Sequence, residues 1–176
     1  MEGEIELPIL NGERVTLRPL CRDDTPVLRA MLVEPEVARW WGDYDDEKLE
    51  RDFFDSLCAS AYAIEADGQW TGVIEFHEVN DPDYRSAGID IVLSTSLHGA
   101  GLGTDALRTL IRYLIDVRGH HRITIDPAAD NTRAIHVYEK VGFRPVGVMR
   151  RYERGSDGQW HNGLLMDLLA EEFDGR

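Results

Sequence analysis

Apolar residues recur along the chain at two different spacings. From Leu102 to Ile115 they repeat every three or four positions, which predicts one buried face of a helix over residues 101–118. Arg14–Leu20 alternates between apolar and polar positions, as a half-buried strand does. The same two patterns predict further helices running to about Val33 and over residues 35–41, 46–57 and 132–141, and further strands over residues 62–66, 71–79, 87–93, 122–126, 144–153 and 162–168.

Turn and cap residues separate these elements. Asp67-Gly68 predicts a hairpin between two strands, and Gly155–Gly158 predicts another near the end of the chain. Asp23 or Asp24 is the expected cap of the first helix, and Asp130 or Asn131 that of the last one. No repeat or linker divides the sequence. A chain of 176 residues that mixes strands and helices is therefore expected to form a single α+β domain over residues 1–176.

Composition limits the class of protein. A hydrophobic content of 43% with 30% charged residues is typical of soluble globular proteins, and no apolar run approaches the ~20 residues that span a membrane. The acidic start MEGEIELPIL lacks the pattern of a signal peptide, so we expect a cytoplasmic protein. Cys21 and Cys58 form no CxxC pair and are expected to be free thiols. His120–His121 has no further ligands nearby, so no metal site is predicted.

The charge balance is strongly acidic. The chain has 19 Lys and Arg residues against 33 Asp and Glu residues, a formal net charge of −14. This argues against nucleic acid as a partner, because nucleic-acid binders carry basic patches. It favours a cationic partner, which a negative field concentrates in clefts. Solubility alone is the alternative explanation.

A glycine-rich turn, HGAGLGT, joins the predicted strand Ala87–Leu93 to the long helix. Gly99, Gly101 and Gly103 allow the backbone to approach a ligand without interference from Cβ atoms. The first turn of the helix presents free N–H groups and the positive end of the helix dipole. The turn therefore predicts a phosphate or diphosphate site, with an ordinary strand-to-helix connection as the alternative.

Two motifs together resemble a known family. His98–Thr104 and Asn131–Phe143, with its asparagine, tyrosine and Gly-Phe end, are similar to motifs of the GNAT superfamily of acetyl-coenzyme A (acetyl-CoA) dependent N-acetyltransferases. Trp40–Gly42, Gly88–Asp90 and Asp126-Pro127 resemble more narrowly the aminoglycoside 6'-N-acetyltransferase group and the related siderophore lysine acyltransferases. The resemblance covers most of the chain.

The resemblance implies a fold and a cosubstrate site. The fold would be a mixed, mostly antiparallel central sheet, flanked by helices and splayed where acetyl-CoA enters. The backbone of the fourth family strand would hold the pantetheine arm, and the glycine loop would hold the diphosphate. The residues implied in cosubstrate binding are Val92, Leu93, His98, Gly99, Ala100, Gly101, Gly103, Thr104 and Asn131. His98 and Ala100 depart from the family, which usually has Arg or Gln at the first position and often a basic residue at the second.

Tyr138 occupies the family's tyrosine position, where the hydroxyl would act as general acid toward the leaving thiolate. A phenol keeps its proton at neutral pH and can donate it. The alternative is a core aromatic residue at helical spacing with Ile135 and Val141. Asn131 is expected to bind the pantetheine, to cap its helix, or to do both.

Asp90 is the candidate general base. It lies in an apolar strand whose neighbours Ile89 and Ile91 point to the opposite face. A carboxylate at such a position is costly unless it has a partner or a function. The matching aspartate of the aminoglycoside group contacts the substrate amine. A salt bridge to Arg85 or Arg122 is the alternative.

The region after the predicted second helix is expected to hold the substrate. Trp40 and Trp41 can stack on sugar rings and attract ammonium groups by cation–π contact. Residues 43–55 contain seven Asp and Glu residues against Lys48 and Arg51. This combination suits a molecule with several amines.

Further acids complete the expected anionic substrate site. Asp43 and one other member of the acidic run are expected to take part. Glu75 has the same parity in its strand as Asp90, so the two are expected to share a cleft. Asp126 and Asp157 match acidic positions of the aminoglycoside group, although Ser-Asp-Gly is also a common turn sequence.

These observations predict an N-acetyltransferase that acts by direct attack in a ternary complex on a small cationic amine. The expected substrate is an aminoglycoside antibiotic, acetylated at the 6' amine by default, with the 2' amine as another possibility. Such a protein would be a resistance enzyme, either monomeric or homodimeric. The alternatives are a ribosomal-protein-type protein Nα-acetyltransferase, a polyamine acetyltransferase, and a degenerate CoA-binding or acidic partner-binding module without activity.

Overall fold

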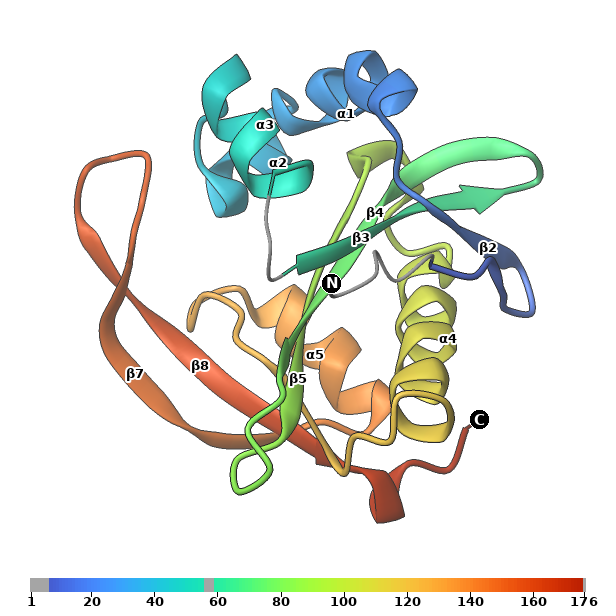
Figure 1. Ribbon diagram of the computed structural model, residues 1–176. Coiled ribbons are helices and arrows are strands. Elements are labelled where there is room, and N and C mark those ends of the chain that lie inside the picture. Colours follow the sequence, from blue (N-terminus) through green and yellow to red (C-terminus); the bar gives the residue numbers. More distant parts are fainter. Residues whose placement is uncertain (1–6, 56–58, 176) are drawn as a thin grey trace.

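A mixed sheet with helices packed on its two faces forms the centre of the computed structural model (Figure 1), which describes residues 7–55 and 59–175. Within this part the sheet has eight strands in the order β1-β2-β3-β4-β5-β6-β8-β7. The strands are β1 (Leu10–Asn11), β2 (Val15–Pro19), β3 (Ala59–Ala66), β4 (Gln69–Val79), β5 (Ser86–Leu93), β6 (Arg122–Ile125), β7 (Arg144–Arg154) and β8 (Trp160–Leu169). The helices are α1 (Thr25–Leu32), α2 (Pro35–Trp41), α3 (Asp46–Phe53), α4 (Leu102–Asp116) and α5 (Thr132–Val141), with short 3-10 turns η1 (Arg22–Asp24), η2 (Thr95–Leu97) and η3 (Ala170–Glu172).

The sheet opens between β5 and β6. Every other neighbouring pair is antiparallel, whereas β5 and β6 run parallel and pair only at Ala87↔Ile123 and Gly88↔Thr124. β6 ends at Ile125, shortly before Pro127, which has no N–H to continue a ladder. The rest of β5 therefore pairs with β4 alone. This confirms the α+β fold and the splayed, mostly antiparallel sheet expected from the sequence.

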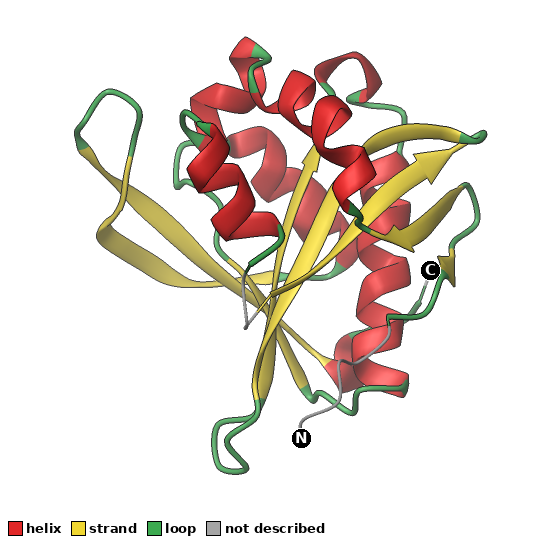
Figure 2. Ribbon diagram, turned by 45° about the horizontal axis from the view of Figure 1, so that its top comes forward, coloured by secondary structure: helices red, strands yellow, loops and turns green. Residues whose placement is uncertain are grey.

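Each face of the sheet is covered by a different set of helices (Figure 2). Ile74, Phe76 and Ile89 belong to the core formed with α4 and α5. Val73 and Val92, which have the opposite parity, belong to the core formed with α1, α2 and α3. The period of two along β4 and β5 thus assigns each side chain to one of two cores. The β7–β8 hairpin extends away from the helices (Figure 1).

Most element bounds agree with the sequence patterns. α2 and α5 begin and end where predicted. α3 is shorter than expected and ends at Phe53, while the predicted end at Leu57 lies outside the described residues, as does Cys58. β3 begins at Ala59 rather than at Tyr62. β1 and the 3-10 turns, with two or three residues each, are too short to leave a periodic signal.

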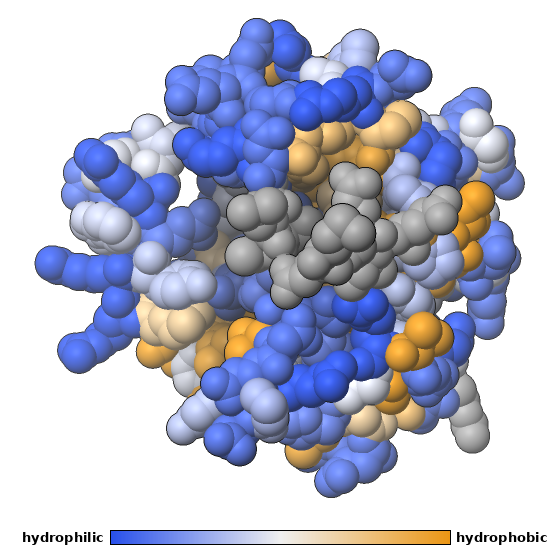
Figure 3. Space-filling view, viewed as in Figure 1, coloured by the Kyte–Doolittle hydropathy of each residue, from blue (hydrophilic) through white to orange (hydrophobic). Residues whose placement is uncertain are grey.

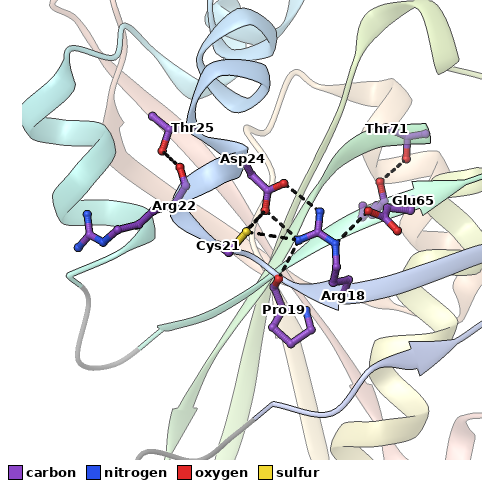
Figure 4. Close-up of polar contacts among 9 residues, drawn as sticks. Arg18, Pro19, Cys21, Arg22, Asp24, Thr25, Glu65 and Thr71 are labelled. Carbon is purple, nitrogen blue, oxygen red and sulfur yellow. Dashed lines mark hydrogen bonds and ion pairs between the residues drawn. The ribbon is translucent and has the colours of Figure 1, made fainter. Parts of the chain in front are cut away.

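Asp24 shows how a polar network replaces an expected helix cap (Figure 4). It stands at the N-cap position of α1, but its carboxylate makes no cap bond. Instead it accepts two hydrogen bonds of 2.9 Å from the Arg18 guanidinium and another from the Cys21 N–H. Arg18 also pairs with Glu65 on β3 at 2.9 Å. Burial alone would raise the pKa of Asp24, but Arg18 and the Cys21 N–H outweigh it and lower the pKa.

The face of the molecule seen in Figure 3 is mainly polar. Figure 3 shows one face on which hydrophilic residues predominate and apolar patches lie apart from one another. Among the described residues, no helix is long and apolar enough to cross a lipid bilayer.

Candidate active site

A cleft of about 920 Å³ lies where β5 and β6 separate. This volume is within the range of small-molecule sites. Its walls come from α2, β5, the glycine loop, α5 and β7. The predicted site residues that line it are Trp40, Trp41, Asp90, Val92, Leu93, His98, Gly99, Gly101, Gly103, Thr104, Asp126, Asn131 and Tyr138.

The glycine loop has the backbone geometry of an anion cradle. Gly99 and Gly101 have φ values of 81° and 80°, a left-handed conformation that favours glycine. Gly101 is the N-cap residue of α4, so the free N–H groups of the first helical turn open onto the cleft. A Cβ atom at Gly99 would meet nothing within 4 Å, which leaves the approach to this backbone clear.

The loop is anchored from its outer side by the turn before β2. The Asp105 carboxylate, in the first turn of α4, accepts hydrogen bonds from the N–H groups of Glu13 (3.2 Å), Arg14 (2.7 Å) and Val15 (3.0 Å). The Arg14 guanidinium in turn donates to the Ala100 carbonyl. Ala100 is a predicted cosubstrate residue that does not line the cleft. Its carbonyl instead ties the loop to the N-terminal strands.

His98 is turned toward the strand. Its Nε2 lies 3.0 Å from the Leu93 carbonyl oxygen, and its Nδ1 is buried without a partner among the described residues. The ring thus fixes the end of β5. Glu34, just before α2, fixes the same region, because its carboxylate accepts bonds of 2.7 Å from the Ser94 hydroxyl and the Thr95 N–H.

Asp90 faces the cleft, and its two expected salt-bridge partners are engaged elsewhere. Arg85 donates to the Arg118 carbonyl at 2.6 Å, and Arg122 pairs with Asp167 at 2.9 Å. The alternative explanation of Asp90 as half of an ion pair with either arginine is therefore wrong.

The surroundings of Asp90 alter its acidity. Burial, followed by the nearby charges of Asp126 and Glu153, raises the pKa of Asp90 to about 6, while His77 opposes this rise. A carboxylate with this pKa is ionised at neutral pH and can still accept a proton readily. These are the properties expected of a general base.

Glu75 stands directly opposite Asp90 in the β4–β5 pairing but does not line the cleft. Its Oε2 is buried and has no hydrogen-bond partner in the described part of the chain. Burial, together with Asp90 and Asp52, raises the pKa of Glu75 to about 8. The two carboxyl groups are neighbours across the strands but do not share the cleft as predicted, and Glu75 holds its proton at neutral pH.

Tyr138 belongs to both the core and the cleft wall. Only 8% of its surface is exposed, and its ring packs edge-on against Phe143 at a centroid distance of 6.2 Å. Burial, and then the charges of Asp90 and Asp126, raise the pKa of Tyr138 well above its usual range. The hydroxyl therefore carries a proton at neutral pH. Asn131 caps α5, since its Oδ1 accepts a bond of 3.2 Å from the Ala134 N–H.

The two tryptophans have different neighbours. Trp41 stacks on Phe53 with ring centroids 6.3 Å apart and packs against the core under α1–α3. Trp40 lies under the Arg39 guanidinium at 4.6 Å. Both tryptophans also line the cleft. Trp41 is a packing residue, whereas Trp40 is paired with a cation.

Asp126 is joined to a residue that the sequence did not suggest. It accepts a hydrogen bond of 2.5 Å from the Tyr152 hydroxyl on β7. This bond, with burial, raises the pKa of Tyr152 to about 12. Glu153, the next residue, also lines the cleft, and burial and Asp126 raise its pKa. Asp90, Asp126 and Glu153 thus form an acidic end of the cleft.

Asp43 and Asp157 do not line this acidic end. Asp157 lies in the β7–β8 turn and binds His161 at 2.9 Å. Asp43 is exposed, and its carbonyl accepts a bond from Lys48. Other acids of residues 43–55 pair with arginines, as the contacts Arg29–Asp46, Arg51–Asp52, Arg22–Glu50 and Arg22–Asp55 show. Fewer acids than the sequence suggested therefore line the cleft, and β7 contributes to its wall.

Several cleft residues escaped the sequence analysis. Tyr152 and Glu153 reach the cleft after a register shift in the β7–β8 pairing, which no spacing in the sequence reveals. Arg133 and Lys140 line it from α5. Their separation of seven residues, with Val137 between them, places them on one helix face, and this signal could have been used.

Comparisons with known proteins agree with this geometry. A family profile described as the acetyltransferase (GNAT) domain matches residues 14–144. The chain belongs to the GNAT acetyltransferase family. It is an acetyl-CoA dependent N-acetyltransferase, and acetyl-CoA is the cosubstrate that the GNAT fold implies.

Two curated GNAT relatives act on different amines according to their names. Spermidine N(1)-acetyltransferase of Escherichia coli K12 is 27% identical over 169 residues, covering 93% of this chain and 90% of the relative. Aminoglycoside N(6')-acetyltransferase type 1 of Klebsiella pneumoniae is 28% identical over 159 residues, covering 79% and 78%. Mycobacterium smegmatis RimJ, solved in complex with CoA-disulfide, has a TM-score of 0.82 and 25% identity over 95% of this chain and 90% of its own.

The residues present fit the cosubstrate. The cleft combines an unpaired stretch of β5, a glycine loop whose residue 99 has free space at its Cβ position, and a helix N-terminus. Arg133 and Lys140 add positive charge to the cleft wall from α5. These cations suit an anionic donor.

Proposed function

We propose that the protein transfers the acetyl group of acetyl-CoA to an amine of a small polyamine. The observation that carries this proposal is the acidic end of the cleft, where Asp90, Asp126 and Glu153 converge. Carboxylates whose pKa values are raised by one another are stabilised by a cation placed among them. A flexible chain with several ammonium groups can supply such charges. The spermidine acetyltransferase relative, matched over nearly the whole chain, supports this acceptor class.

The donor would lie along the open edge of β5. Leu93 lines the cleft there, and because its carbonyl already contacts His98 Nε2, its N–H would be the group that holds the pantetheine arm. The N–H groups at Gly101–Thr104 would hold the diphosphate. Arg133 and Lys140 would neutralise further phosphate charge. When bound, acetyl-CoA supplies an activated acetyl thioester. The protein's own residues then have to position the amine and move protons.

Asp90 would remove the first proton. Its carboxylate accepts a proton from the substrate ammonium, which leaves a neutral amine with a free lone pair. The Tyr138 hydroxyl holds a proton at neutral pH and would deliver it to the departing sulfur. Cys21 is exposed and is not part of the cleft wall, and Cys58 lies outside the described residues. Direct attack in a ternary complex is the mechanism these positions support.

An aminoglycoside is the second candidate acceptor. The observation that favours it is the presence of Trp40 and Trp41 beside the acidic end, because indole faces stack on sugar rings. The aminoglycoside acetyltransferase relative also supports it, over a smaller share of the chain. The protein would then be a resistance enzyme.

An acceptor panel tests this proposal. Acetyl-CoA turnover is measured with spermidine, spermine, two aminoglycosides and N-terminal peptides at equal concentrations. We expect kcat/KM to be highest for a polyamine. A higher kcat/KM for an aminoglycoside would select the second candidate, and preference for a peptide would contradict both.

A further inference from the structure

The His77 ring packs over Gly88, which lies two residues from Asp90 in β5. The space above Gly88 that the ring fills is called the seat of His77. In the β4–β5 pairing, His77 stands opposite Gly88. A Cβ atom at Gly88 would lie 2.1 Å from the His77 Cε1 and 2.3 Å from its Nε2. Real side chains do not approach so closely, so the ring occupies the place that any other residue at position 88 would fill.

This seat places the His77 ring over Gly88, on the same sheet face as the base. Asp90 is two residues from Gly88 and therefore lies on the same face of β5. Diagonal neighbours on adjacent strands are within reach of an aromatic side chain. Both residues line the cleft, and His77 in its protonated form lowers the pKa of the Asp90 carboxyl group. His77 is exposed to solvent, whereas Asp90 is only partly exposed.

The proposed reaction leaves a proton to be removed. An ammonium substrate loses two protons as its nitrogen becomes an amide, and the sulfur that leaves takes up one. One proton per turnover must therefore reach solvent. A base that kept this proton would be neutral at the start of the next cycle.

The other ionisable groups around Asp90 are less suited to pass its proton to solvent. Glu75 already holds a proton at neutral pH, and its Oε2 is buried. Asp126 accepts the hydrogen bond of Tyr152. The pKa of Glu153 is raised by partial burial and by Asp126, while Lys48 opposes this rise. Imidazole differs from these carboxyl groups because it has two ring nitrogens, so it can accept a proton at one and release a proton from the other.

We propose that His77 is a positioning residue that acts through Asp90: it takes the proton from Asp90 and returns it to solvent, and Gly88 is its required seat. This inference rests on the proposed function, in which Asp90 deprotonates the amine. It assigns a role to the β4 wall of the cleft and explains why position 88 carries no side chain.

The test uses His77→Ala, Gly88→Ala and Asp90→Asn, with His136→Gln as the control, because His136 is exposed on α5 and does not line the cleft. We expect His77→Ala and Gly88→Ala to lower kcat by about tenfold, toward the low end of acid–base effects. Their CoA affinity by calorimetry should be unchanged. Added imidazole should restore much of the kcat of His77→Ala but none of that of Asp90→Asn.

Three results would overturn the inference. One is a parental kcat and pH profile in His77→Ala while Asp90→Asn is slow. Another is a slow His77→Ala that imidazole does not rescue, which indicates a structural role. A Gly88→Ala variant with parental kcat would remove the role of the seat. Full activity in Asp90→Asn is a different failure, since it would contradict the proposed function itself.

Discussion

Glu75 and Asp90 stand directly opposite each other on β4 and β5, and only the Asp90 carboxyl group faces the cleft. Burial raises the pKa of Glu75 to about 8 and that of Asp90 to about 6. Between about pH 6 and about pH 8 the pair of carboxyl groups holds one proton, and this proton stays on Glu75. Neighbouring carboxyl groups on one sheet face thus have different protonation states at neutral pH.

Glu75 should make the fold less stable as the pH rises. Its pKa is raised from 4.5 to about 8, so its favourable contribution is complete below pH 4.5 and is lost as the pH increases to about 8. Asp90 acts in the same direction only up to about pH 6. Glu75→Gln should therefore increase the free energy of unfolding at pH 9 by roughly 2 to 4 kcal/mol. Urea unfolding at pH 5 and pH 9 measures this change.

Glu139→Gln, at an exposed position of α5, is the matched control and should leave the pH dependence unchanged. If Glu75→Gln shows the same decrease between pH 6 and pH 9 as the parent protein, Glu75 is not the group responsible.

Asp105 should matter for the cosubstrate although it does not line the cleft. Asp105→Ala removes the acceptor of three main-chain N–H groups in the turn that anchors the glycine loop. We expect unfolding free energy to fall by about 2 kcal/mol and CoA affinity to fall about tenfold. Asp116→Ala, at the exposed end of α4, is the control. Unchanged CoA binding in calorimetry would contradict the anchoring role.

Tyr138→Phe removes one hydroxyl group and leaves the ring packed against Phe143. Loss of a general acid should lower kcat by a factor of about 10² to 10³ with little change in KM. Tyr84→Phe, at a residue 76% exposed, should have no effect. Stopped-flow measurement of thiol release compares the two. A parental rate in Tyr138→Phe would show that another group protonates the sulfur.

Much of the fold could be predicted because its signals are local. The period of two in β4 and β5 assigned Ile89 and Asp90 to opposite faces, and the helical spacing of α4 identified its buried side. The glycine loop and the α5 motif located the two walls of the cleft. Short elements such as β1 were missed because two residues cannot show a period.

The acceptor end of the site was predicted less well, because it depends on contacts between distant segments. Tyr152 reaches Asp126 through a register shift in β7, and the loop tie from Arg14 to Ala100 joins residues 86 positions apart. The acidic run after α2 suggested a substrate cup, yet its carboxylates pair with Arg22, Arg29 and Arg51. The sequence shows how many charges are present but not which of them are neutralised.

The pH dependence of kcat/KM in the parent protein and in Asp90→Asn, with the best acceptor of the panel, tests the central claim most directly. The parent rate should rise with pH through about 6, as Asp90 loses its proton. Asp90→Asn should lose this rise and at least 100-fold of the rate at pH 7.5. An Asp90→Asn protein with the parental rate and profile would contradict the account.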